Sequence, residues 1–192
     1  MPSTDWNKYW DEKADSYKTS EERIKITTTM VGRLKEVLDV GCGKGELALA
    51  LCKNHNSVWG VDFSYNMVEI CAQKGLDVKI GKANNLPFDD NAFDVVTALG
   101  LIEYLKDDNS FLSEAHRVLK PEGKLIVSCR NSLFSKWSGR EYEPERRTHN
   151  PDTVKLPGFD IISMVFFHEH FPHKFDDEKY YHSTFVIEGI KR

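Results

Sequence analysis

An open α/β sheet built from strand–helix–strand units is the fold class that the sequence predicts. First, the buried-strand pattern of residues 37–40 runs directly into a glycine-rich turn, which a helical pattern follows from Glu46. Second, the next strand pattern ends in Asp62, which follows Gly41 by 21 residues, a separation typical of a βαβ unit that binds a ribose. Third, strand patterns and helical patterns continue to alternate along the chain.

The elements are expected in a simple order. Residues 5–35 are amphipathic and rich in aromatic side chains, and we expect the helical face with Trp6, Tyr9 and Trp10 to pack on the core. A Pro-Glu-Gly turn at 121–123 separates the last helical pattern from a strand. The expected strands are 37–40, 57–62, 77–80, 92–99, 124–129, 159–167 and 181–190, and the expected helices are 46–52, 65–74 and 109–120.

Composition limits the class of protein. With 192 residues the chain can bury a sizeable core as one domain. The formal charge of −4 provides no general attraction to nucleic acid or to an anionic membrane, so neither partner is expected. No apolar run approaches the ~18 residues of a transmembrane helix, and the first residues do not resemble a secretory signal. The four cysteines lack C-x-x-C spacing and indicate reduced thiols in a cytoplasmic protein.

The turn after the first strand has a glycine at every second position: Gly41, Gly43 and Gly45. Glycine lets the backbone turn sharply and approach a ligand, and the following helix offers unpaired N–H groups and a partial positive charge. The dinucleotide fingerprint G-x-G-x-x-G requires a glycine where this chain has Glu46. A carboxylate there repels a pyrophosphate, which argues against an NAD-dependent oxidoreductase, although that class stays an alternative.

The pattern D-x-G-x-G-x-G over 39–45 resembles motif I of the class I S-adenosylmethionine-dependent methyltransferases of the small-molecule branch. Leu-Pro-Phe at 86–88 and V-L-K-P-E-G-K-L-I-V at 118–127 are similar to later motifs of the same family. The resemblance implies a Rossmann-like, doubly wound sheet of seven strands with strand seven antiparallel. It also implies methyl transfer from S-adenosylmethionine to a small-molecule acceptor, with S-adenosylhomocysteine as product. A module of the same fold without catalysis stays a further alternative.

This resemblance runs from about Tyr9 to the C-terminus and is strongest over 36–128. It implies a single methyltransferase domain over 1–192 in four parts. These are an N-terminal helical lid (1–35), a cofactor-binding core (36–128), an acceptor-side loop (129–158) and closing antiparallel strands (159–192).

The expected cofactor-binding residues follow the family's motifs onto this chain. A carboxylate at Asp62 can accept hydrogen bonds from two vicinal ribose hydroxyls; its alternative role is to cap the next helix, a task for which Ser64 is better placed. Asp39 suits the positive end of the cofactor. The complete expected set is Tyr17, Asp39, Gly41, Cys42, Gly43, Asp62, Phe63, Met67, Ala83, Asn84, Leu86, Leu99 and Gly100.

One position departs from the family's adenine-binding stretch G-D-A-x-x-L-P-F, because Lys82 replaces its acid. The acid accepts a hydrogen bond from the adenine amino group in the family, whereas a lysine has only donors. Asn84 can substitute through its amide oxygen, and Lys82 can equally point to solvent.

The charged stretch that leaves the fifth strand is expected to overhang the pocket and to contact the acceptor. Paired N–H donors of arginine can bind an anionic acceptor, although three glutamates in the same stretch balance the charge and favour a solvated loop. The acceptor-binding candidates are Arg130, Arg140, Arg146 and Arg147, and His149 adds a further donor.

A general base is needed only if the acceptor loses a proton, and the candidates for it are His149, His168, His170 and Glu103. Glu103 can instead cap a helix or lie in solvent. His168 and His170 share a strand face and, with His173, would also suit zinc. Because the chain has neither an H-E-x-x-H helix nor a cysteine beside these histidines, no metal is expected.

Overall fold

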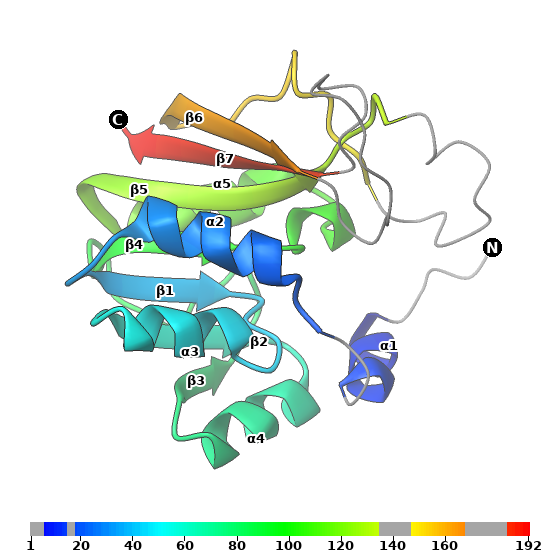
Figure 1. Cartoon of the computed structure of the whole chain (residues 1–192), viewed down its shortest axis with the longest axis vertical. Helices are drawn as coiled ribbons and strands as arrows, with labels where there is room; N and C mark the ends of the chain where they lie inside the picture. The colour runs from blue at the N-terminus through cyan, green and yellow to red at the C-terminus, as the bar shows by residue number, and fades with distance from the viewer. Residues whose placement is uncertain (1–5, 15–17, 135–146, 168–183) are drawn as a thin grey trace.

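The structure is a computed structural model that describes residues 6–14, 18–134, 147–167 and 184–192. These residues form a seven-stranded sheet in the order β3-β2-β1-β4-β5-β7-β6 (Figure 1). β7 runs antiparallel to both of its neighbours, and the neighbouring pairs from β3 to β5 are parallel. The doubly wound sheet with an antiparallel seventh strand, predicted from the sequence, is therefore confirmed.

The elements begin and end close to their expected positions. The strands are β1 Glu36–Val40, β2 Ser57–Asp62, β3 Asp77–Ile80, β4 Phe93–Ala98, β5 Leu119–Arg130, β6 Phe159–Phe167 and β7 Thr184–Lys191. The helices are α1 Trp6–Lys13, α2 Glu21–Val31, α3 Glu46–Lys53, α4 Tyr65–Gln73 and α5 Asp108–Val118, with a 3₁₀ turn, η1, at Ile102–Tyr104. Among the helices of the described residues, none has both the length and the apolar character needed to cross a bilayer.

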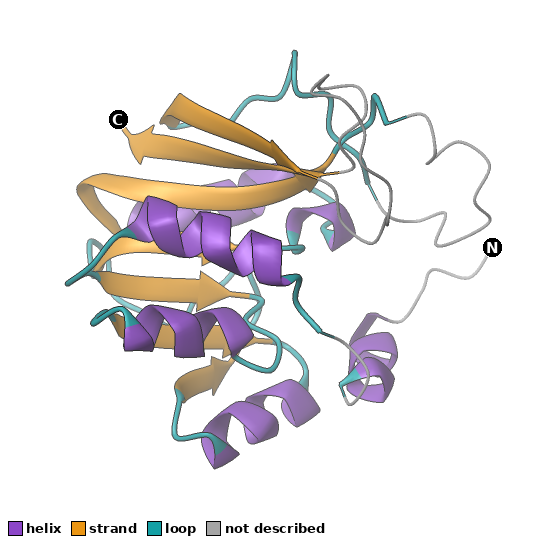
Figure 2. Cartoon of the chain, in the orientation of Figure 1, coloured by secondary structure: helices purple, strands orange, loops and turns teal. Residues whose placement is uncertain are grey.

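Helices cover both faces of the sheet, because successive side chains of each strand point to opposite sides (Figure 2). On one face, Val37 and Val95 pack with Leu47 and Leu51 of α3 and with Val31 of α2. The opposite face packs against α5, and its buried members include Leu38, Val96, Leu125, Phe111 and Leu112. Full burial of one such side chain stabilises a fold by about 1.5–3 kcal/mol, so the alternating pattern specifies which face each helix covers.

Side-chain caps start three of the helices. The Ser64 hydroxyl accepts a hydrogen bond from the Met67 backbone N–H at 3.3 Å and caps α4, as its position in the sequence predicts. Ser20 and Asp107 do the same for α2 and α5. The Ser20 cap also divides the N-terminal stretch into two helices, where the sequence pattern indicated only a single amphipathic region.

The junction of α5 and β5 differs from its prediction. The helix ends at Val118 instead of residue 120, and the strand begins at Leu119 instead of residue 124. Pro121 disfavours a helical conformation for the residue before it, and the Ala92 N–H donates a hydrogen bond to the Val118 carbonyl at 2.8 Å. The Pro-Glu-Gly turn survives as a bulge in the β4–β5 pairing, where Glu122 has a φ of +61°.

Candidate functional site

The glycine turn after β1 is tied to the end of β2. The backbone N–H groups of Gly41 and Cys42 both donate to the Val61 carbonyl, at 2.7 and 3.1 Å. Gly41 has a φ of +71°, and a Cβ there would lie 3.1 Å from Cδ1 of Leu101. The turn therefore needs glycine both for its backbone conformation and for the space next to the β4 end.

Two adjoining hollows follow this turn and share Gly41, Gly43 and Leu99; together we call them the crevice. The larger encloses about 440 Å³, including its open mouth, and the smaller about 270 Å³. The larger is lined by Trp10, Gly41, Gly43, Asp62, Phe63, Met67, Leu99, Gly100, Leu101 and Tyr104. The smaller adds Thr19, Asp39, Cys42 and Leu47. Nine of the thirteen expected cofactor residues therefore line one continuous space.

Asp62 ends β2 and is only 7 % exposed. Its Oδ2 accepts a hydrogen bond from the Gly43 N–H and its Oδ1 one from the Ser64 N–H, both at 2.9 Å. Burial raises the pKa of this carboxyl, and the backbone hydrogen bonds oppose that rise. Each carboxylate oxygen can still accept a second hydrogen bond, so Asp62 can hold the glycine turn and accept from a ligand's hydroxyls together.

Asp39 lines the smaller hollow, and its Oδ1 accepts a hydrogen bond from the Thr97 hydroxyl at 2.7 Å. Burial raises the pKa of Asp39 to about 7; the Thr97 hydrogen bond opposes the rise and the charge of Asp62 adds to it. Because a buried carboxylate without a cation is costly, a positively charged group beside Asp39 would favour its ionised form.

The end of β4 contributes Leu99, Gly100 and Leu101 to the wall of the crevice. Gly100 has a φ of +66°, and its N–H donates a hydrogen bond to the buried Ser128 hydroxyl of β5 at 2.7 Å. This bond holds Leu99 and Leu101 at the carboxyl edge of the sheet, where open α/β sheets bind their ligands.

The sequence analysis missed two aromatic residues of the site. Trp10 was expected to pack on the core, and instead it lines the crevice and meets the Tyr104 ring edge-to-face, with centroids 5.2 Å apart. Tyr104 lies in η1, a short turn that no periodic sequence pattern predicts. The only sequence signal for Trp10 was the similarity of its segment to the lid of small methyltransferases.

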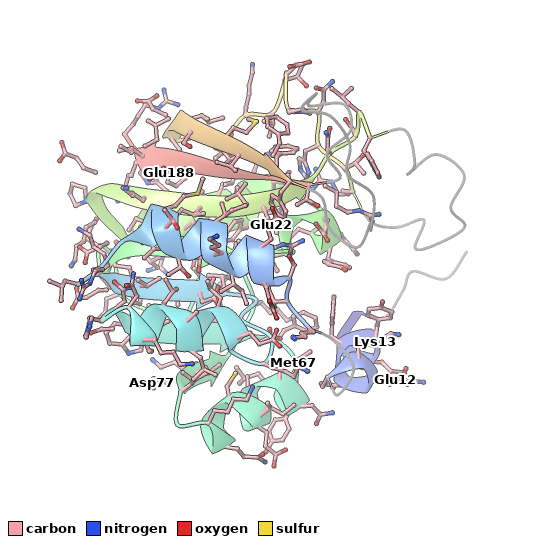
Figure 3. All side chains as sticks on the ribbon, viewed as in Figure 1. Glu12, Lys13, Glu22, Met67, Asp77 and Glu188 are labelled. Atoms are coloured by element: carbon pink, nitrogen blue, oxygen red, sulfur yellow. The ribbon has the colours of Figure 1, made fainter. Side chains whose placement is uncertain are left out.

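Polar contacts attach the N-terminal segment across the crevice. A carboxylate oxygen of Asp11 accepts hydrogen bonds from the Ser64 hydroxyl and, at 3.4 Å, from the Asn66 N–H at the start of α4. The Thr19 N–H donates to Oε2 of Glu46 at the start of α3, at 2.6 Å. Figure 3 shows α1, with Glu12 and Lys13, beside the end of α4 that carries Met67.

Three expected adenine-side residues do not line the crevice. Leu86 is buried in the core, and its N–H donates a hydrogen bond to the Glu114 carboxylate at 2.7 Å. Ala83 packs beside the same core, whereas Asn84 and Lys82 are exposed. Lys82 is therefore exposed to solvent, which is one of the two alternatives that the sequence left open for this residue.

On the acceptor side, one carboxylate gathers two of the candidate residues. The Arg147 guanidinium donates from both terminal nitrogens to Asp108, at 2.5 and 3.1 Å, and Nε2 of His149 lies 3.0 Å from the same carboxylate. The Arg147 N–H also donates to the Glu103 carbonyl at 2.8 Å. Although burial opposes the change, the hydrogen bonds from His149 and Arg147 lower the pKa of Asp108.

Among the base candidates that the structure describes, His149 has the geometry that best suits a proton acceptor. With Nε2 against Asp108, its Nδ1 is buried and has no hydrogen-bond partner among the residues that the structure describes. Glu103 is buried within η1, and Arg130 ends β5. Tyr17, Arg140, Arg146, His168 and His170 lie outside the described residues.

Comparison with known proteins agrees with this geometry. A methyltransferase-domain family model matches residues 38–127. A demethylmenaquinone methyltransferase of Staphylococcus epidermidis is 39 % identical over 109 residues, which are 53 % of this chain and 45 % of that protein. An uncharacterised protein of Methanocaldococcus jannaschii is 32 % identical over 165 residues, covering 84 % of this chain and 75 % of that one. The chain thus spans about half the length of the quinone methyltransferases it matches.

Solved structures share the fold. A methyltransferase of Thermotoga maritima, described as a possible histamine N-methyltransferase, superimposes with a TM-score of 0.69 at 24 % identity, covering 88 % of this chain and 87 % of that one. The YcgJ protein of Bacillus subtilis gives a TM-score of 0.67 at 20 % identity, covering 90 % and 99 %. The chain belongs to the class I S-adenosylmethionine-dependent methyltransferases, whose cofactor is S-adenosylmethionine.

Proposed function

We propose that this chain transfers the methyl group of S-adenosylmethionine to a small-molecule acceptor bound beside the ends of β4 and β5. The observation that carries the proposal is the placement of Asp62 and Asp39 in the two adjoining hollows that follow the glycine turn. One acid in each hollow suits a ligand with an ammonium group and a ribose with two adjacent hydroxyls.

The crevice residues fit this cofactor. The turn leaves open the space that a Cβ at Gly41 would fill. Asp62 can accept from the ribose hydroxyls, and Asp39 can pair with the ammonium group at the cofactor's other end. The apolar side chains of Phe63, Met67 and Leu99 provide a dry wall for the rest of the cofactor.

The cofactor supplies an activated methyl group on a sulfonium, so the protein's part is chiefly position and exclusion of water. Trp10 and Tyr104 cover the crevice from the side of α1 and η1. The hydrogen bond from Gly100 to Ser128 holds the end of β4 against β5. These contacts orient the two reactants without any covalent step on the protein.

We further propose that His149 accepts a proton when the acceptor must lose one. Asp108 accepts the hydrogen bond of Nε2 and thereby selects the tautomer whose Nδ1 has a free lone pair. Nδ1 is buried and unpartnered within the described part of the chain, which suits a proton acceptor and is costly for a purely structural histidine. Arg147 is engaged by Asp108, so its role is to position this pair instead of binding an anion directly.

The test uses the purified chain with S-adenosylmethionine carrying a labelled methyl group and an acceptor panel. The panel contains hydroquinones, phenols, amines and carboxylic acids, and mass spectrometry follows labelled product and S-adenosylhomocysteine. We expect S-adenosylhomocysteine to accumulate only with an acceptor, and a hydroxyl-bearing ring to be favoured. Cofactor binding without any product would support a non-catalytic module, and binding of NAD alone would overturn the proposal.

A further inference from the structure

Two cysteines that the proposed chemistry does not use meet behind the glycine turn. Cys42 lies in the turn between Gly41 and Gly43 and borders the smaller hollow, and Cys71 lies on α4 with its side chain fully buried. They are 29 positions apart in the sequence, so a C-x-x-C spacing could not predict that they lie close together. The structure brings them together because α4 packs against β2 and β3, close to the turn after β1.

Both sulfur atoms converge on the same backbone carbonyl. The Cys71 Sγ donates to the Gly43 carbonyl oxygen at 3.2 Å, and the Cys42 Sγ lies 3.8 Å from the same oxygen. The interaction between the two thiols lowers the pKa of Cys71, and the same interaction together with burial raises the pKa of Cys42. Both thiols are free, so two reduced sulfurs share one acceptor.

Gly43 is held from two sides. Its N–H donates to Asp62, the acid expected at the ribose, while its carbonyl receives the thiol hydrogen bonds. A residue with a φ of +52° and no side chain has little else to fix its backbone. The position of the ribose acid is therefore linked through one glycine to the protonation and oxidation state of the sulfurs.

We propose that Cys42 and Cys71 form a reversible disulfide that weakens cofactor binding, with a small peroxide as the oxidant. One sulfur takes an oxygen atom as the O–O bond breaks, which gives a sulfenic acid and releases water. The other thiol attacks that sulfur, the S–S bond forms, and a second water leaves with the remaining protons. Two thiols are oxidised by two electrons in total, and one hydrogen peroxide is reduced to two waters.

The disulfide has no S–H group, so the Gly43 carbonyl loses its thiol donors and the backbone of Gly43 is held less firmly. We expect S-adenosylhomocysteine to bind about five- to tenfold more weakly to the oxidised chain. By thermodynamic linkage, bound S-adenosylhomocysteine must oppose formation of the disulfide by the same factor. The inference rests on cofactor binding at the glycine turn and needs no acceptor or turnover.

The chain is convenient for the experiment because trypsin cuts after Lys35, Lys44, Lys53 and Lys74. Cys42, Cys52 and Cys71 then lie on three different peptides. After hydrogen peroxide treatment, we expect mass spectrometry to show the Cys42 and Cys71 peptides joined, and dithiothreitol to separate them. Calorimetry with S-adenosylhomocysteine on both forms measures the affinity change.

Cys52→Ser, at an exposed position on α3, is the matched control and is expected to keep the full response to oxidation. Cys71→Ser is expected to abolish the difference between oxidised and reduced protein. Absence of the Cys42–Cys71 peptide after peroxide would overturn the proposal, and so would a disulfide with unchanged affinity. The cross-link is detected without cofactor, so failure of the proposed methyl transfer leaves this result interpretable.

Discussion

The cofactor side and the acceptor side of this protein are built in different ways. On the cofactor side, Asp39, Gly43 and Asp62 lie within or directly after neighbouring parallel strands, and the Gly43 N–H donates a hydrogen bond to the Asp62 carboxylate. On the acceptor side, Asp108 meets Arg147 and His149 across 39 and 41 residues of chain. The first arrangement is local in sequence, whereas the second is made by tertiary packing. The comparison suggests that cofactor binding and acceptor chemistry can be damaged separately.

The largest expected effect is on the acceptor side. His149→Gln removes the basic ring nitrogen but keeps a hydrogen-bond donor for Asp108, so we expect turnover of a proton-losing acceptor to fall about 100-fold or more. The affinity for S-adenosylhomocysteine, measured by calorimetry, is expected to stay unchanged. His55→Gln, at an exposed position between α3 and β2, is the matched control. Equal loss of affinity and turnover in His149→Gln would contradict the separation of the two sides.

Loss of the ribose acid is the next largest expected effect. Asp62→Ala leaves the N–H groups of Gly43 and Ser64 without their acceptor, and we expect cofactor binding to weaken by ~1–3 kcal/mol, about five- to 150-fold. Asp62→Asn keeps one acceptor oxygen and should show a smaller loss with an unchanged melting temperature. Asp77→Ala on neighbouring β3, which is exposed, is the control (Figure 3). If all three variants bind alike, Asp62 is only a structural acid.

A pH effect of about tenfold is expected at Asp39. Because its pKa in the ligand-free protein is about 7, the carboxyl is mostly protonated at pH 6 and mostly ionised at pH 8. An ammonium group bound beside Asp39 favours the ionised form, so affinity for S-adenosylhomocysteine should rise about tenfold between these pH values. Calorimetry at pH 6, 7 and 8 measures it, and Asp39→Asn should remove the slope.

The same carboxyl has the opposite effect on folding. An acid whose pKa is raised in the folded state is ionised earlier in the unfolded chain, so its contribution to stability is lost as pH rises between about 4 and 7. The ligand-free Asp39→Asn variant should therefore melt at a higher temperature than the parent at pH 8. A lower melting temperature at that pH would show that Asp39 serves mainly as a partner for Thr97.

The smallest expected effect concerns the lid. Trp10→Ala removes the ring that lines the crevice and contacts Tyr104, and we expect an affinity loss of about two- to fivefold, mostly through faster dissociation. Stopped-flow displacement of S-adenosylhomocysteine measures the rate, and Glu12→Ala on the exposed side of α1 is the control. An unchanged dissociation rate would mean that α1 does not cover the bound cofactor.

The sequence predicted the sheet well because alternating burial, glycine spacing and a strand-end acid are local signals. It predicted most of the crevice lining for the same reason. It failed for Trp10, whose aromatic character suits a core equally well, and for Tyr104, which lies in a 3₁₀ turn without periodicity. Leu86 illustrates the opposite failure: its motif was recognised, yet the side chain points into the core, while its backbone N–H donates to Glu114 and its carbonyl accepts from Arg117. The grouping of Asp108, Arg147 and His149 had no local signal at all.

The attachment of α1 has a kinetic consequence. Asp11 joins this helix to the start of α4, and the rings of Trp10 and Tyr104 join it to η1. Detaching a short helix near the chain terminus costs less free energy than opening the sheet. S-adenosylhomocysteine can therefore exchange for S-adenosylmethionine while the rest of the molecule stays folded. The rate at which this short helix opens would then limit the rate of a full catalytic cycle.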